Sequence, residues 1–232
     1  MVILYHAVRI HLMFTIPLFP LQTVLFPGMP LHLHIFEPRY RTMVQACMEQ
    51  NQPFGVVLIR RGEETFSEMA EPYPIGCTAR IVDVEPLEQG CFNITTLGED
   101  RFQILSLSTS EDAYLQAEVE FIPLEHPRTL YMLRAVRPLS AQMNSYLCSI
   151  AAMDAEWQDL CDLQLPQEPL HLAYLAASLL QIPAHEKQPL LAAKTANELF
   201  DQVNRLVRRE NAILHHLGHT PHEEAQRASW LN

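Results

Sequence analysis

The sequence is poor in charge, in glycine and in long apolar runs. Charged residues make up 19% of the chain, below the roughly 25% of an average soluble domain. No apolar run approaches the roughly 18 residues of a membrane-spanning helix, which excludes one. The 7 glycines are scattered, and none forms a phosphate-binding loop. The nucleophile elbow G-x-S-x-G and the zinc motifs H-E-x-x-H and H-x-E…C-x-x-C are also missing. The sequence therefore contains none of these phosphate-binding, nucleophile or zinc motifs.

The sequence also has few positively charged residues. The chain has 16 Lys and Arg against 27 Asp and Glu, a formal net charge of −11. Only Lys187 and Lys194 are lysines, and the densest basic spots are the pairs Arg60-Arg61 and Arg208-Arg209. Such a balance disfavours nucleic acid and anionic membranes as partners.

Cysteine spacing excludes two further kinds of site. The 5 cysteines are odd in number and form no C-x-x-C pair, which argues against a zinc knuckle and a redox dithiol. Most lie among apolar neighbours, so we interpret them as small buried side chains. With no secretory signal, a reducing cytoplasm is the expected compartment. We expect no cofactor and no metal.

The chain is rich in apolar residues that can form a core. It comprises 232 residues, 48% of them apolar, enough for one large domain or two small ones. Residues 1–14 form an apolar extension without the features of a leader peptide, and a strong folded pattern begins at Thr15. Met13 as the true start and an added edge strand or ordered arm are equally open interpretations of residues 1–14.

Residues 15–123 carry the signals of strands and turns. The prolines in Ile16–Leu21 predict an edge or polyproline segment. Leu31–Phe36 alternates as a half-buried strand, and one helix follows from Pro38. The apolar phase slips after Ile81, which predicts a bulge there. The residues around Gly98-Glu99-Asp100 predict a hairpin, and the alternation over Leu115–Phe121 predicts a clear strand. The segment 61–70 is polar and predicts an exposed loop.

From residue 124 the apolar period becomes helical and predicts a second subdomain over 124–217. A long helix is expected to be kinked at Pro138, and Gly218 is a natural helix cap. The tail 218–232 is expected to be flexible. The predicted helices cover 130–150, 157–163, 170–180, 183–191 and 196–217.

The most specific stretch is the junction between the strand at 31–36 and the following helix. Glu37 is placed to cap that helix, and Arg39 or Arg41 to pair with it or to reach another loop. A structural ion pair and one wall of a ligand groove are both open interpretations. The candidate residues are His32, His34, Phe36, Glu37, Arg39 and Tyr40. A second cluster, His215, His216, His219 and His222, has metal-ligand spacing in part, but a solvated tail explains it better.

These residues resemble a known family, the amino-terminal substrate-binding domain of Lon protease, which also occurs as a free-standing protein and within cereblon. The resemblance covers about residues 15–217 and implies a mixed α+β fold, a PUA-like β-pseudobarrel with one inserted helix followed by an α-helical bundle. The segments that carry it are Ile16–Leu21, Val24–Gly28, His34–Tyr40, Phe54–Leu58, Ile75–Ala79, Asn93-Ile94, Gly98–Phe102, Leu115–Phe121 and Ile182–Leu191.

The resemblance implies recognition without catalysis, because the chain has neither the ATPase module nor the serine–lysine peptidase domain of Lon protease. It implies a module that binds unfolded or partly folded proteins and peptides, an adaptor in protein quality control with a protease or chaperone as partner. RNA binding by the PUA-like fold and a small-molecule site near His32, His34 and Glu37 are the alternatives.

Overall fold

A computed structural model describes residues 13–61, 71–124, 130–153 and 155–218. The chain divides into two compact units. The barrel unit is Met1–Pro123 with Pro183–Ala192, and the helical unit is Leu124–Ile182 with Ala193–Asn232. The fold class is mixed α and β, as expected. The predicted loop 61–70, apart from Arg61, and the predicted extension, apart from Met13 and Phe14, lie outside the described residues.

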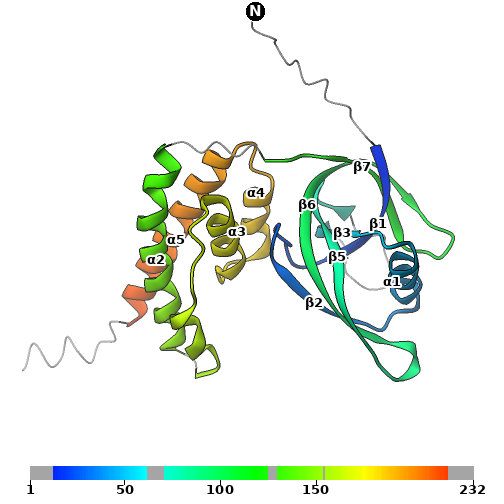
Figure 1. The fold of residues 1–232 in the computed structure, drawn as a ribbon, viewed down its shortest axis with the longest axis horizontal. Helices are drawn as coiled ribbons and strands as arrows, with labels where there is room; N and C mark the ends of the chain where they lie inside the picture. Colours follow the sequence, from blue (N-terminus) through cyan, green and yellow to red (C-terminus); the bar gives the residue numbers. More distant parts are fainter. Residues whose placement is uncertain (1–12, 62–70, 125–129, 154, 219–232) are drawn as a thin grey trace, which may run out of the picture. The chain divides into compact units, whose positions relative to one another are not determined.

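The barrel unit is a sheet that curls into a ring (Figure 1). Its order is β1-β7-β6-β5-β3-β4, and β1 also pairs with β3, which closes the ring; β2 pairs with β6 beside this path. The inserted helix α1 lies against the ring, as the residues after Pro38 predicted. The elements are β1 (Met13–Leu21), β2 (Pro30–Ile35), α1 (Pro38–Gln50), β3 (Phe54–Arg61), β4 (Glu71–Pro72), β5 (Ile75–Pro86), a short 3-10 turn η1 (Glu88–Gly90), β6 (Phe92–Thr109) and β7 (Leu115–Phe121).

Strand β1 is not the edge segment that its prolines predicted. Its first half pairs antiparallel with β7 up to Pro17↔Gln116, and its second half pairs parallel with β3, including Pro20↔Val57. In this register each residue of β1 has one neighbouring strand, never two, so a missing N–H is tolerated at either proline. Each proline therefore has a strand on one side only, although β1 as a whole pairs with two strands and closes the ring.

The barrel core is built around Phe102, whose side chain is fully buried. A Cβ atom at Gly55 or at Gly76 would approach its ring to 2.7 or 2.5 Å, so both glycines leave room for this aromatic. Leu18 and Val119 pack in the same cluster. Such dense packing explains why two strands carry glycine where β-branched residues are otherwise favoured.

Strand β6 runs unbroken through the predicted hairpin at Gly98-Glu99-Asp100, so that prediction was wrong. The reversals lie instead at η1 and at the turn before Tyr114. Gly98 serves close packing rather than a turn, because a Cβ atom there would lie 2.3 Å from the carbonyl oxygen of Phe26. The bulge predicted after Ile81 is confirmed by a register shift between Ile81 and Asp83.

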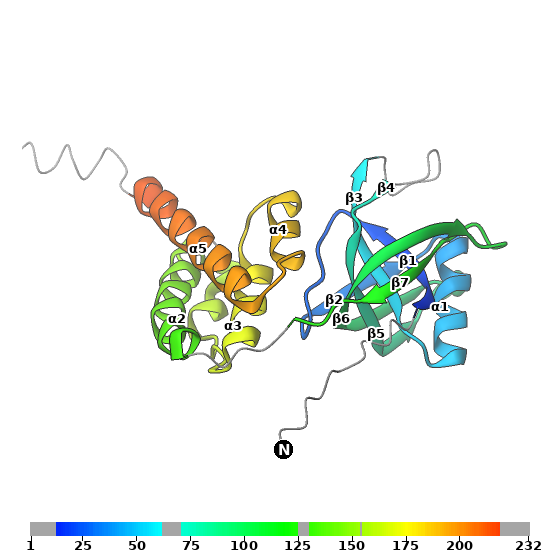
Figure 2. The ribbon, with the colours of Figure 1, turned by 90° about the horizontal axis from the view of Figure 1, so that it is seen from above.

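The helical unit contains α2 (Leu130–Ala151), the 3-10 segment η2 (Ala155–Asp162), α3 (Pro169–Leu179) and α5 (Ala196–Gly218). Helices α2 and α5 run side by side (Figure 2). Buried Leu139 and Met143 of α2 and Phe200 of α5 belong to its core. These elements match the helices predicted from the apolar period, and Pro138 lies inside α2. No described helix has the length and apolar character needed to cross a membrane.

Helix α4 (Ala184–Leu191) belongs to the barrel unit, whereas the sequence placed all of 124–217 in one helical subdomain. The amide of Gln188 donates to the carbonyl of Ile75 on β5 at 2.8 Å. Buried Arg101 of β6 donates from Nη1 to the carbonyl of Leu191 at 2.6 Å and from Nη2 to that of Ile122 at 3.1 Å. The bonds of Gln188 and Leu191 hold α4 to the sheet.

Two cysteines differ from the expectation of small buried thiols. Cys148 of α2 and Cys161 of η2 form a disulfide across 13 residues of chain. Cys47 and Cys77 are buried free thiols, as expected, and Cys91 is half-buried. The spacing of Cys148 and Cys161 matches no sequence motif, so only the packing of η2 on α2 brings them together.

Candidate functional site

The structure divides the six candidate residues into an exposed row and a buried junction. The row is His32 and His34 of β2 with Phe36 just beyond it, on the face that alternation in β2 turns outward. The His34 ring stacks on that of Phe36 with centroids 5.8 Å apart, and Phe36 remains 57% exposed. An aromatic side chain this exposed is available for contact with a partner.

Cross-strand hydrogen bonds fix the two imidazoles of the row. His32 Nδ1 lies 3.0 Å from Thr95 Oγ1, and His34 Nδ1 lies 2.9 Å from Asn93 Oδ1. The Asn93 amide in turn donates to Glu85 of β5 at 3.0 Å. The outer face of β2, β6 and β5 is therefore a polar ladder with preset side-chain positions.

The other three candidate residues form a packed junction. Arg39 Nε donates to Glu37 Oε2 at 3.0 Å, and the Arg39 guanidinium lies 4.5 Å from the centre of the Tyr40 ring. Tyr40 stacks on Phe19 of β1 at 4.1 Å. Glu37 occupies the N-cap position of α1 but makes no side-chain cap bond, contrary to the expected capping role. Arg41 reaches the loop at Gln89, one of the two outcomes that the sequence left open.

A pocket of about 320 Å³ opens between the end of α1 and β5. Its walls include Met48 of α1 and Val82 of β5, which are both exposed apolar side chains, with Asp83 beside them. Sequence reasoning missed this pocket. The slipped phase at Ile81 was the available signal, because a bulge re-aims side chains toward a neighbouring element.

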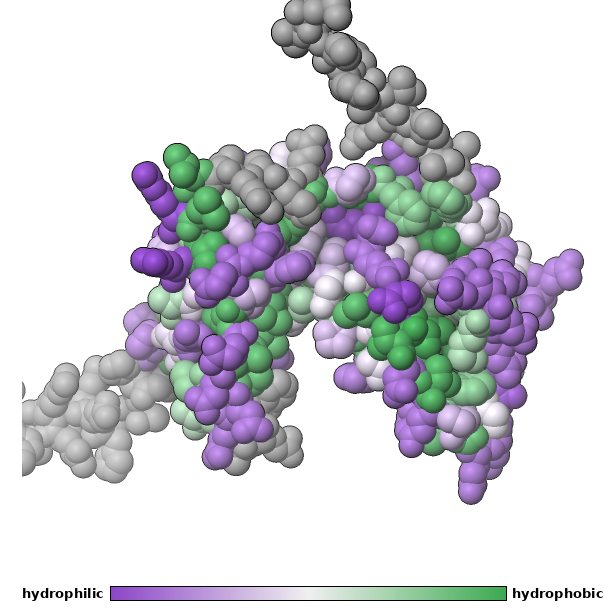
Figure 3. All heavy atoms as spheres, viewed as in Figure 1, coloured by the Kyte–Doolittle hydropathy of each residue, from purple (hydrophilic) through white to green (hydrophobic). Residues whose placement is uncertain are grey.

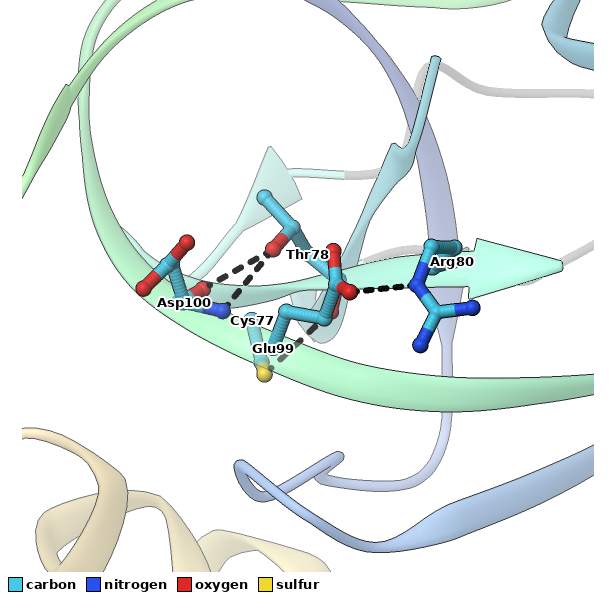
Figure 4. Close-up of polar contacts among 5 residues, drawn as sticks. All are labelled: Cys77, Thr78, Arg80, Glu99 and Asp100. Atoms are coloured by element: carbon cyan, nitrogen blue, oxygen red, sulfur yellow. Dashed lines mark hydrogen bonds and ion pairs between the residues drawn. The ribbon is translucent and has the colours of Figure 1, made fainter. Parts of the chain in front are cut away.

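The β5 wall of the pocket is held by polar contacts to β6 (Figure 4). The Thr78 hydroxyl accepts from the backbone N–H of Asp100 at 2.9 Å and donates to its carbonyl oxygen at 3.3 Å. Next to it, the Arg80 guanidinium pairs with the carboxylate of Glu99. These contacts position the chain at the pocket without supplying a reactive group.

Apolar side chains are exposed on both units. In Figure 3 they gather over the strands around β5 and over the start of α2. On the barrel unit, Phe36, Val82, Leu105 and Leu107 are each close to half exposed or more; on the helical unit, Leu130, Tyr131, Leu133 and Met153 are more than half exposed.

Burial shifts the pKa of two thiols and one amine. Burial raises the pKa of the Cys47 thiol to about 12 and raises the pKa of Cys77 as well, which keeps both protonated. Desolvation lowers the pKa of Lys187. Among the described residues no group of three or more metal-ligating side chains converges. His215 and His216 are exposed on α5, and His219 and His222 lie outside the described residues.

Comparison with known proteins matches residues 15–209 to the substrate-binding domain of ATP-dependent protease La (LON). The chain belongs to this family. The Lon protease of Anaeromyxobacter dehalogenans is 26% identical over 204 residues, which is 86% of this chain and 24% of that protein. Lon protease 2 of Myxococcus xanthus is also 26% identical over 204 residues, with the same coverage. This member of the Lon family thus spans about a quarter of the length of these relatives.

Solved structures of Lon amino-terminal domains share the fold. The N-terminal domain of a Lon protease from the Mycobacterium avium complex superposes with a TM-score of 0.61 at 18% identity, covering 84% of this chain and 98% of that one. A Lon N-terminal domain protein from Xanthomonas campestris gives a TM-score of 0.57 at 20% identity with the same coverage. The expected family and fold are confirmed.

Proposed function

We propose that this chain is a non-catalytic recognition module that binds unfolded or partly folded polypeptides. In this role it acts as an adaptor in protein quality control and delivers bound chains to a protease or chaperone. The observation that carries the proposal is the match of residues 15–209 to a substrate-binding domain. The exposed apolar side chains on both units supply a physical means of binding.

The charge of the chain refines the kind of polypeptide. A net charge of −11 favours association with neutral or basic segments and repels acidic ones. Folded proteins keep most large apolar side chains inside, so unfolding is what offers such segments to the exposed residues of the two units. Preference for an unfolded over a folded form of one sequence is therefore the property to measure.

Lysozyme in two states provides a matched test, because the reduced and carbamidomethylated protein is unfolded yet has the charge of the native one. We expect the chain to bind the unfolded form at micromolar concentration, and native lysozyme at least tenfold more weakly, by fluorescence anisotropy. Phe36→Ser should weaken binding several-fold, and Thr42→Ser, at an exposed polar position of α1 in the same unit, serves as its control. Equal binding of both lysozyme states, or of neither, would contradict the proposed function.

A further inference from the structure

Strand β2 has one open edge. It pairs antiparallel with β6 over six residues, from Pro30↔Leu97 to Ile35↔Phe92, and with no second strand in the parts of the chain that the structure describes. The end strand of the path, β4, is only two residues long and ends in Pro72. Among the described strands, only β2 and β4 pair with a single strand along their whole length, so β2 is the longer strand that is open along one entire side.

The register identifies which backbone groups face that open edge. The N–H of Gly98 donates to the carbonyl of Met29 at 2.9 Å, and its carbonyl accepts from the N–H of Gly28 at 2.8 Å, so Met29 and Gly98 form the hydrogen-bonded pair at which the ladder begins. Such pairs alternate with pairs whose backbone groups point away from each other. The N–H and C=O groups of His32 and of His34 consequently point away from β6. Four backbone groups along β2 can thus form hydrogen bonds with another strand.

The open edge of β2 lacks the features that usually prevent an edge strand from pairing with another chain. Pro30 blocks only the first position, no lysine or other permanent charge lies in β2, and the six pairs with β6 run without a register shift. By contrast, the ladders of β3 with β4, β5 with β6 and β6 with β7 each contain a shift. A straight, uncharged edge next to an exposed Phe36 is the arrangement that accepts an added strand.

We propose that β2 binds an extended polypeptide segment by strand addition, with backbone hydrogen bonds to His32 and His34. This inference rests on the proposed function and specifies its site and mode. An extended chain repeats its outward N–H and C=O groups every second residue, at the spacing that His32 and His34 present. The backbone supplies most of the affinity, so the mode suits a module that accepts many unrelated sequences.

The two faces beside the edge define the preferred segment. On one face the added side chains lie next to His32, His34 and Phe36; on the other they extend the half-buried row of Leu31 and Leu33. The carboxylates of Asp83 and Glu85, opposite Thr95 and Asn93 in the ladder, make the outer face acidic. The segment is therefore neutral or basic, with apolar residues at alternate positions, as in the half-buried strands of folded proteins.

The test uses a fluorescent, acetylated nonapeptide of alternating threonine and valine with a central phenylalanine and a terminal lysine. Two versions carry N-methyl groups on the amides of one strand edge or of the other. We expect one version to bind the full chain at least tenfold more weakly than the parent peptide, and the other to bind within about threefold, because only one edge of the peptide faces β2. Equal binding of the two versions, strong or weak, overturns strand addition.

On the protein side, His32→Pro removes an outward N–H while sparing the hydrogen bonds to β6, and His32→Ala keeps that N–H as the matched control. We expect His32→Pro to weaken parent-peptide binding about tenfold, and His32→Ala by less than threefold.

Should His32→Pro fail to fold, the comparison of the two N-methylated peptides still tests strand addition. A wild-type dimer that the same proline dissociates and that excludes the peptide would assign the edge to a second copy and overturn the proposal. Undiminished binding of unfolded lysozyme by folded His32→Pro overturns strand addition alone, whereas no binding by the wild type ends the proposed function as well.

Discussion

The barrel unit and the helical unit are built by opposite means. In the barrel unit, buried polar groups tie distant segments together, as Arg101 does with Leu191 and Thr78 with Asp100. In the helical unit, the buried surface is mostly aliphatic, and a disulfide joins two neighbouring elements. The barrel unit also contains the straight open edge of β2, whereas helices satisfy their backbone groups internally.

This difference indicates where recognition belongs. A ring closed by strand pairing and tied by buried polar groups can hold the β2 edge in a fixed position through its six pairs with β6. Helical surfaces offer apolar side chains such as Leu130 but no backbone groups to direct an extended chain. We therefore expect sequence-tolerant binding at β2 and only auxiliary contacts on the helical unit.

Thiol chemistry gives the largest predicted contrast between the units. Because burial raises the pKa of Cys47 to about 12, its thiolate population at pH 8 should be about a thousandfold below that of an ordinary cysteine. Iodoacetamide labelling with mass spectrometry should leave Cys47 and Cys77 unmodified in the native protein. After reduction, exposed Cys161 should label within minutes; rapid native labelling of Cys47 would show that the barrel core is not sealed.

Arg101→Met tests the polar ties of the barrel unit. It removes two charge-assisted hydrogen bonds and leaves buried carbonyls without a donor, so the free energy of unfolding should fall by about 4 kcal/mol. Urea denaturation followed by circular dichroism measures the change. Arg80→Met, which removes an exposed ion pair, is the matched control and should cost less than about 1 kcal/mol. Similar losses for the two variants would remove polar ties as a distinguishing feature of the barrel unit.

The disulfide is the corresponding test of the helical unit. Its 13-residue separation predicts a contribution of about 3 kcal/mol to stability through the restricted unfolded chain. The double variant Cys148→Ser, Cys161→Ser should lower the melting temperature in calorimetry, and reductant should then have no further effect. Serine replacement of half-buried Cys91 is the control. An unchanged melting temperature in the double variant would mean that packing alone holds η2 on α2.

The smallest effect is expected for Thr78→Val, which keeps the shape of the side chain but loses both hydrogen bonds to Asp100. We expect a loss of about 1–2 kcal/mol in urea denaturation. Thr42→Val removes a single exposed bond to the carbonyl of Pro38 and should be nearly neutral. If Thr78→Val were equally neutral, the two hydrogen bonds between Thr78 and Asp100 would not stabilise the ring.

The sequence predicted what periodicity determines and missed what depends on distant contacts. The apolar stripe ending at Leu217 was sufficient to predict α5, and alternation was sufficient to predict β2. Gly98-Glu99-Asp100 has the composition of a turn, yet the approach of Phe26 from another segment decides the need for glycine. The affiliation of α4 with the barrel unit and the Cys148–Cys161 bond depend equally on packing that no local pattern records.

The candidate site divides in the same way. Alternation was sufficient to place His32, His34 and Phe36 on one exposed face, because these positions follow a strand period. That β2 has an open edge depends on which strands pair, and the pocket beside Val82 depends on where α1 ends. Both are properties of the assembled sheet.

Hydrogen–deuterium exchange of the full chain, with and without reduced carbamidomethylated lysozyme, tests most directly whether β2 is the recognition edge. If it is, the amides of His32 and His34 exchange quickly in the free protein and become protected on binding, with smaller changes on the helical unit. Unchanged exchange across β2 in the presence of bound lysozyme, or protection confined to the helical unit, would contradict recognition at β2.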